Sequence, residues 1–129
     1  MNPYEVLLSN KAFAIIGASN DETRMSNYAY KLLKSKGKHV YPVHPTLETL
    51  DNDPVYKKVS DIPQNVDVAV FFVNASIGIN ALDDVVEKGI QTIWLQPGTL
   101  SEELVKKAES LNLNIIKDCV IATYNRNEN

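Results

Sequence analysis

The architecture of this chain is indicated by residues 12–26, which read AFAIIGASNDETRMS. The first five residues form a short, continuous apolar run, which is typical of a strand buried on both faces of a parallel sheet. The run ends at Gly17, and a polar loop follows. Apolar residues then recur at helical spacing between Ser26, the predicted N-cap, and Gly37, where we expect the helix to close with a left-handed residue.

The rest of the chain repeats this alternation of strand and helix. Apolar runs predict four further strands, at residues 39–43, 67–73, 91–95 and 114–117. Helical periodicity predicts one helix at 77–89 and another at 99–111, where Thr99 and Glu102 have capping-box spacing. Alternating strands and helices with short turns imply right-handed crossovers. We therefore predict an α/β fold: a doubly wound parallel sheet of about five strands with helices on both faces.

The remaining segments give weaker signals. Residues 46–60 are polar and irregular, with a minor extended piece at 54–56. Residues 1–11 are interpreted as an N-terminal lead-in, and residues 124–129 as too polar to be more than a tail. The whole chain, 1–129, is predicted to form a single domain.

Composition excludes several classes of protein. The chain has 129 residues, 44% of them hydrophobic, and a formal net charge of -3, so it lacks the basic footprint of a nucleic-acid-binding protein. Its single cysteine, Cys119, excludes an internal disulfide framework, and no cluster has the spacing of a metal site. No apolar run approaches the roughly 20 residues that span a bilayer. We expect a protein of the reducing cytoplasm, with no membrane association.

Candidate binding residues follow the strands, because ligands of doubly wound sheets lie beyond the carboxyl ends of the strands. The loop 17–26 joins the first strand to the first helix, where amides and the helix dipole favour a phosphate. It departs from the G-x-G-x-x-G fingerprint, since Gly17 is a single glycine and the hydroxyls and Arg24 stand in for the others. The alternative is that Gly17 only lets the strand turn and that Arg24 is solvated.

The end of the second strand discriminates between nucleotides. An NAD site places an acid there, whereas this chain has Val43-His44-Pro45. A carboxylate would repel a phosphate on the ribose and His44 would tolerate it, so the loop favours NADP or coenzyme A (CoA). The alternative is a loop histidine held by backbone partners.

In order and spacing, five segments and Arg24 resemble the small stand-alone CoA-binding domain proteins of bacteria. They are Ile15–Ser19 with Arg24, Tyr41–Pro45, Asp67–Val70, Trp94–Gly98 and Asp118-Cys119. The same Rossmann-like domain is similar to the CoA-binding part of the succinyl-CoA synthetase alpha subunit and related acyl-CoA synthetases.

The resemblance implies a set of CoA-binding residues. Near the pyrophosphate it implies Gly17, Ala18, Ser19, Asn20, Arg24 and Ser26. Near the adenosine and its 3'-phosphate it implies Val43, His44 and Pro45, where the family more often has Val-Asn-Pro. Over the adenine and the start of the pantetheine arm it implies Val73, Asn74, Gln96, Pro97 and Gly98.

The resemblance also implies what the chain does not do. The phosphorylated histidine of the synthetases lies beyond this domain, and neither His39 nor His44 matches it. We therefore expect binding of CoA or an acyl-CoA without ligase activity, with no catalytic residue. Two alternatives stay open, a minimal NADP-binding reductase and a ligand-free partner domain of a separately encoded synthetase subunit. Cys119 is either a small apolar residue or a thiol that exchanges with CoA.

Overall fold

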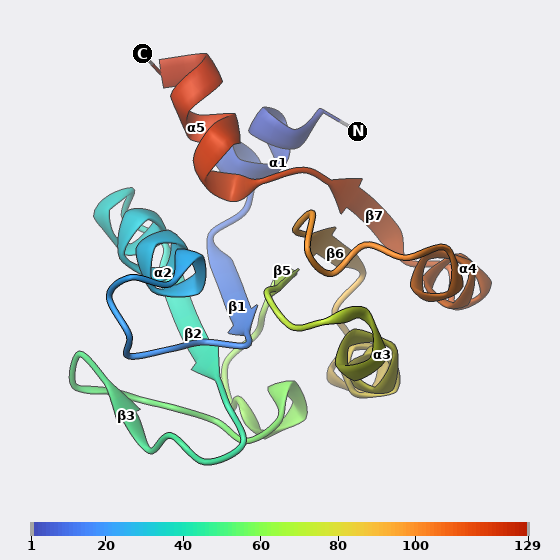
Figure 1. The fold of residues 1–129 in the computed structure, drawn as a ribbon, viewed down its shortest axis with the longest axis horizontal. Helices are drawn as coiled ribbons and strands as arrows, with labels where there is room; N and C mark the ends of the chain where they lie inside the picture. Colours follow the sequence, from blue (N-terminus) through green and yellow to red (C-terminus); the bar gives the residue numbers. More distant parts are fainter. Residues whose placement is uncertain (1, 129) are drawn as a thin grey trace.

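Five parallel strands form the central sheet of the computed structural model, which describes residues 2–128 (Figure 1). In spatial order they are β2 (His39–Val43), β1 (Ala12–Ile16), β5 (Val68–Phe71), β6 (Thr92–Leu95) and β7 (Asn114–Lys117). The chain runs outward from β1 to β2 and then returns to β5 on the other side of β1. The predicted doubly wound sheet is confirmed, and the strand order reverses beside β1.

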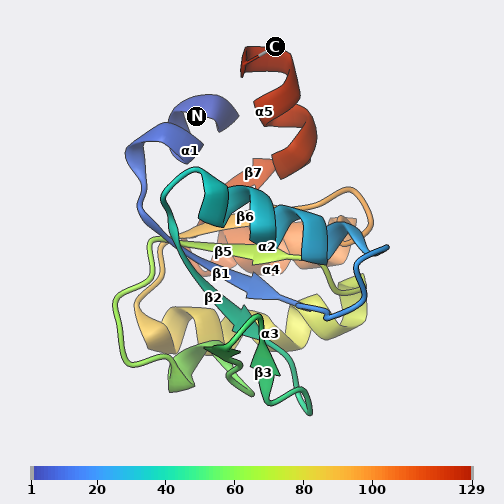
Figure 2. The ribbon, with the colours of Figure 1, turned by 90° about the vertical axis from the view of Figure 1, so that its left-hand side faces the viewer.

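Helices cover both faces of this sheet (Figure 2). One face carries α1 (Pro3–Ser9), α2 (Met25–Ser35) and α5 (Val120–Glu128). The other carries α3 (Ala75–Lys88), α4 (Glu102–Ser110) and the short 3-10 helix η1 (Val59–Asp61).

Alternate side chains of β1 supply both layers of the core. Phe13 and Ile15 pack with the first group of helices, and Ala14 and Ile16 with the second. All five residues of β1 are buried, which is why the strand appears in the sequence as an uninterrupted apolar run.

The two ends of the chain are helical, so the prediction of a lead-in and a polar tail was wrong. Asn2 caps α1 by accepting from the amide of Tyr4 at 2.9 Å. In α5 only a narrow stripe is buried, formed by Val120, Thr123 and Tyr124, and residues 125–128 are polar and exposed. Average polarity hides such a stripe. Met1 and Asn129, the outermost residues of the predicted lead-in and tail, lie outside the described residues.

Two predicted helix caps were also wrong. Ser26 lies inside the first turn of α2, whose N-cap is Arg24 without a capping side chain. Ser101, not Thr99, caps α4 by accepting from the Leu104 amide at 3.1 Å. The Thr99 hydroxyl is instead buried and donates to the Phe71 carbonyl at the end of β5, at 3.0 Å.

A small hairpin that the sequence analysis missed follows β2. It pairs β3 (Thr49–Leu50) with β4 (Asp53–Pro54) through a turn in which Asp51 and Asn52 have positive φ angles of 47° and 69°. Such a turn favours Asp and Asn, so the Asp51-Asn52 pair was an available signal.

The hairpin is attached to α2 by a polar cluster of Tyr30, Lys34 and Asp53. The Tyr30 hydroxyl is buried and hydrogen-bonds to the Asp53 carboxylate, and the Lys34 ammonium donates to the same oxygen at 2.7 Å. Burial raises the pKa of Asp53, but the hydrogen bonds from Lys34 and Tyr30 outweigh it, so the pKa lies below its ordinary value. Burial and the contact with Asp53 raise the pKa of Tyr30 to about 12.

We predict that Asp53→Asn destabilises the fold in a pH-dependent way. An aspartate whose pKa is lowered by folding stabilises the fold above its unfolded-state pKa, and this contribution is lost as the pH falls through the folded-state pKa. The substitution therefore lowers the free energy of unfolding at neutral pH, and the difference from the wild type shrinks in acid. Urea unfolding from pH 7 down to about pH 3 measures both effects.

Asp61→Asn, at an exposed aspartate of η1, is the matched control. Its difference from the wild type should stay small at every pH. A difference for Asp53→Asn that does not change with pH would contradict the role given to this carboxylate.

Candidate ligand-binding site

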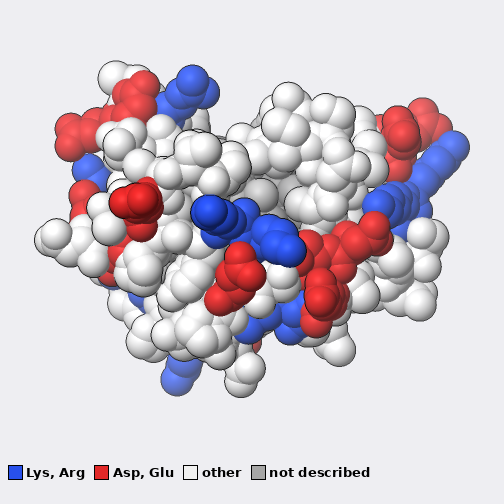
Figure 3. Space-filling view, turned by 90° about the horizontal axis from the view of Figure 1, so that it is seen from below, with Lys and Arg blue, Asp and Glu red and all other residues white. Residues whose placement is uncertain are grey.

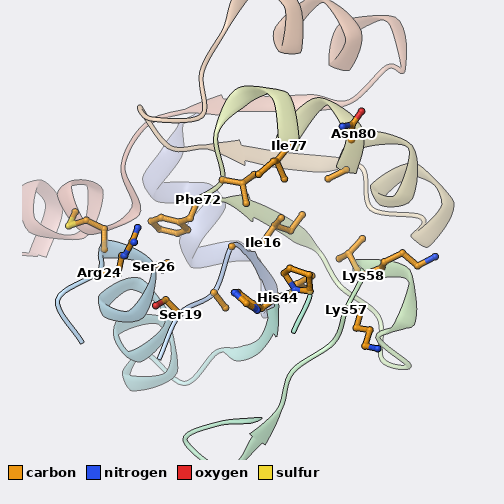
Figure 4. A pocket seen from close by; sticks show the side chains of 18 of the residues that line it. Ile16, Ser19, Arg24, Ser26, His44, Lys57, Lys58, Phe72, Ile77 and Asn80 are labelled. Carbon is orange, nitrogen blue, oxygen red and sulfur yellow. The ribbon is translucent and has the colours of Figure 1, made fainter. Parts of the chain in front are cut away.

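A cavity of about 930 Å³ opens at the carboxyl ends of β1 and β2, between the first turn of α2 and one face of α3 (Figure 4). Its apolar lining comes from strand ends and the residues after them, including Ile16, Val43, Phe72 and Val73. Its polar lining comes from the loop before α2, the loop after β2 and residues 57–58. The cavity lies where the strand order reverses, the usual position of a ligand in this architecture.

Gly17 brings the first loop to the cavity. Its φ is +90°, and its amide and that of Ala18 both donate to the Val43 carbonyl at 3.1 Å. A Cβ at this position would stand 2.8 Å from Cγ1 of Val73 and 3.1 Å from the Phe72 carbonyl carbon. Only glycine combines this dihedral angle with this close approach.

The first turn of α2 presents backbone donors to the cavity. No side chain of the described residues caps this helix, and no protein acceptor in that part of the chain takes the amides of Met25, Ser26 and Asn27. Met25 and Ser26 line the cavity. Uncapped amides at the positive end of a helix dipole form a site for an anion.

Hydrogen bonds within the loop hold its polar side chains beside these amides. The Ser19 hydroxyl accepts from the Asp21 amide at 3.0 Å, and the Asn27 side chain donates to the Ser19 carbonyl at 2.9 Å. Asp21 accepts from both the hydroxyl and the amide of Thr23, which lowers the pKa of its carboxyl. The Arg24 guanidinium is 4.0 Å from Asp21 and 72% exposed, so it is free to reach a ligand.

His44 lines the cavity and also organises the loop after β2. Its Nδ1 accepts from the amides of Thr46 and Leu47, at 3.1 and 2.9 Å. With Nδ1 as the acceptor, the proton of the neutral ring lies on Nε2. Backbone amides thus hold His44 through Nδ1, as the alternative interpretation expected. The ring nevertheless also faces the cavity.

Nine of the fourteen residues predicted to bind the ligand line this one cavity. They are Gly17, Ala18, Ser19, Arg24, Ser26, Val43, His44, Pro45 and Val73.

The other five predicted residues, Asn20, Asn74, Gln96, Pro97 and Gly98, lie outside this lining. The Asn74 side chain caps α3 by accepting from the Ile77 amide at 3.0 Å. Gln96 is buried, and its Oε1 accepts from the Val120 amide at the start of α5, at 2.9 Å. Cys119 is half-buried and also stands outside the lining.

The sequence analysis missed one complete wall of the cavity. On α3, Ile77, Asn80, Ala81 and Asp84 line it with helical spacing, and Lys57 and Lys58 line it opposite the α2 end. The sequence did show the four α3 residues recurring at helical spacing, on the face of the helix next to its buried residues. The two lysines left no signal, because only the folded chain brings them to the cavity.

The surface around the carboxyl ends of β1 and β2 carries mixed charge. Figure 3 views the molecule from that side and shows acidic and basic side chains interleaved rather than one continuous basic area. An anion is therefore attracted by local groups, not by a general positive field.

Within residues 2–128 no three His, Cys, Asp or Glu side chains gather as metal ligands, and no helix is both long and apolar enough to cross a membrane.

Comparison with known proteins gives consistent matches. A family model described as a CoA binding domain matches residues 11–125. The chain is 30% identical over 122 residues to acetate–CoA ligase [ADP-forming] I of Archaeoglobus fulgidus, which covers 87% of this chain and 18% of that protein. It is 29% identical to the alpha subunit of acetate–CoA ligase [ADP-forming] II of Pyrococcus furiosus, over 92% of this chain and 28% of the subunit. The chain thus spans less than a third of either relative.

A solved structure supports the same grouping at the level of the fold. A hypothetical protein from Pyrococcus horikoshii OT3 superposes with a TM-score of 0.91 and 31% sequence identity, covering 96% of this chain and 88% of that one.

We predict that Gly17→Ala destabilises the fold by about 1–3 kcal/mol, because the new Cβ meets Val73 and the positive φ is strained. Thermal or urea unfolding measures the change. Gly98→Ala is the matched control, because no atom lies within 4 Å of its added Cβ. Equal stability of the two variants would show that the backbone moves away from Val73 at little cost.

Proposed function

The chain belongs to the CoA-binding domain family, and from this premise we propose that it binds CoA or an acyl-CoA in the cavity beside α2, without ligase activity of its own. The observation that carries the proposal is the convergence of nine residues, selected from sequence for CoA contacts, on one cavity of about 930 Å³. That volume lies in the ordinary range for sites that bury a nucleotide-sized ligand.

The pyrophosphate is assigned to the first turn of α2. Uncapped amides of Met25 and Ser26 line the cavity there, together with the hydroxyl of Ser19 and the guanidinium of Arg24. Charge-assisted hydrogen bonds from backbone amides and arginine are the usual means of holding a diphosphate. This assignment gives the uncapped amides of Met25 and Ser26 an acceptor in the bound state.

The adenosine is assigned to the loop after β2. Val43, His44 and Pro45 line the cavity, and none of them is the acid that would accept from the ribose hydroxyls of NAD. This favours a ribose that carries a phosphate. NADP satisfies the same condition, so the reductase alternative is an arm of the test below.

A partner role is the second candidate function. Two of the matched relatives are larger proteins, a ligase and a ligase alpha subunit, and this chain spans 18% of the first and 28% of the second. On this proposal the domain holds no ligand of its own and docks on a separately encoded synthetase subunit. Recovery of such a subunit in a pull-down, with no ligand binding by the chain alone, would favour the partner role over independent CoA binding.

A thermal-shift titration with CoA, 3'-dephospho-CoA, NADP and NAD tests the ligand class. A ligand at about 100 times its dissociation constant stabilises the folded state by about 2.7 kcal/mol. We expect the largest shift with CoA. A larger shift with NADP would favour the reductase, and no shift with any of the four would contradict ligand binding by the isolated chain.

We predict that Arg24→Ala weakens CoA binding by on the order of 1.5–3 kcal/mol, as expected for the loss of a charged hydrogen bond. Isothermal titration calorimetry measures the change. Arg126→Ala is the control, because Arg126 pairs with Asp118 on α5 and lies outside the cavity. An unchanged affinity in Arg24→Ala would remove this residue from the site.

A further inference from the structure

Residues 55–58 form an extra extended segment beside the end of β2. The Tyr56 amide donates to the Pro42 carbonyl at 3.0 Å, and the His44 amide donates to the Tyr56 carbonyl at 2.9 Å. Val43 and Tyr56 pair as a parallel bridge. Lys57 and Lys58 therefore continue in step with His44 and Pro45, and this pairing places two lysines at the rim of the cavity.

Both lysines are exposed, and both line the cavity. Within residues 2–128 neither ammonium forms an ion pair or a hydrogen bond, whereas Lys34, Lys36 and Lys107 each pair with a carboxylate. Two adjacent unpaired cations on one rim repel each other, and a bound anion relieves that repulsion.

The lysines stand at the opposite end of the cavity from Arg24. Figure 4 shows Arg24, Ser19 and Ser26 on one side, His44 between, and Lys57 and Lys58 on the other. Cationic side chains therefore stand at both ends of one cavity, Arg24 beside Asp21 at one end and the two lysines at the other, which suits a ligand with two separate phosphate groups. CoA is such a ligand, because its 3'-phosphate is separated from its pyrophosphate by the ribose.

The loop after β2 contributes no lysine or arginine to the end of the cavity where Lys57 and Lys58 lie. His44 Nδ1 is occupied by two amides, and Pro45, Thr46 and Leu47 are uncharged. Asp84 is the carboxylate lining that end, and one of its oxygens accepts from the Ser60 amide at 3.0 Å. Two lysines against one hydrogen-bonded carboxylate leave the net local charge positive.

We infer that Lys57 and Lys58 bind the 3'-phosphate and make the cavity selective for ligands built on adenosine 3'-phosphate. The inference rests on the proposed CoA function and adds its specificity determinant. His44 orients the loop and offers Nε2–H, while the lysines supply the charge that distinguishes CoA from dephospho-CoA.

The test compares CoA and 3'-dephospho-CoA by calorimetry on the wild type and on the double variant Lys57→Gln/Lys58→Gln. In the wild type we expect CoA to bind about tenfold more tightly than dephospho-CoA, a modest ratio because exposed lysines are screened by solvent. In the double variant the ratio should fall to about one, with the affinity for dephospho-CoA unchanged. Raising the salt concentration should reduce the wild-type ratio.

Lys11→Gln/Lys106→Gln is the matched control, since it removes the same charge at two sites outside the cavity. It should keep the wild-type ratio. A ratio that survives in the Lys57/Lys58 variant, or a wild type that binds both ligands equally, overturns the inference while CoA binding stands. A wild type that binds neither ligand overturns the proposed function, and the inference with it.

Discussion

The hydrogen bonds to the Val43 carbonyl hold the carboxyl ends of β1 and β2 together, and the cavity is built around them. This carbonyl accepts the amides of Gly17 and Ala18, which ties the turn after β1 to the end of β2. The same turn presses against Phe72 and Val73 after β5, so three strand ends meet around one glycine without a side chain. The first turn of α2 and the loop of His44 both reach the cavity from this junction.

The central strands were predictable because a parallel strand buried on both faces is apolar throughout. β1 and β2 agree with their predicted bounds, and β5 is shorter than the predicted 67–73. Two of the failures, at Thr99 and in α5, share one physical cause, which is that a partner distant in sequence decided the outcome. Thr99 had the local spacing of a cap, but its hydroxyl is used by the end of β5. The helix α5 forms because a narrow stripe finds a hydrophobic surface that its own sequence does not reveal.

The same division applies to the candidate site. Residues directly after β1 and β2 were accessible to sequence reasoning, because the topology brings the carboxyl ends of these strands together. Lys57 and Lys58 were not, because the extended piece predicted at 54–56 ends before them and the sequence does not show that Tyr56 pairs with β2. His44 shows a third case, in which both interpretations describe the same ring. One nitrogen accepts from the loop as an asparagine oxygen would, and the other is left for the cavity.

The helix α2 contributes to both ends of the cavity. Its first turn carries the uncapped amides, and Tyr30 and Lys34, farther along the same helix, hold the hairpin that leads into residues 55–58. The loop at one end of the cavity and the hairpin that precedes the other end are thus fastened to the same helix. On the proposed function, α2 is a common support for both ends of the site, so a substitution in one loop alters the chemistry at one end without detaching the other.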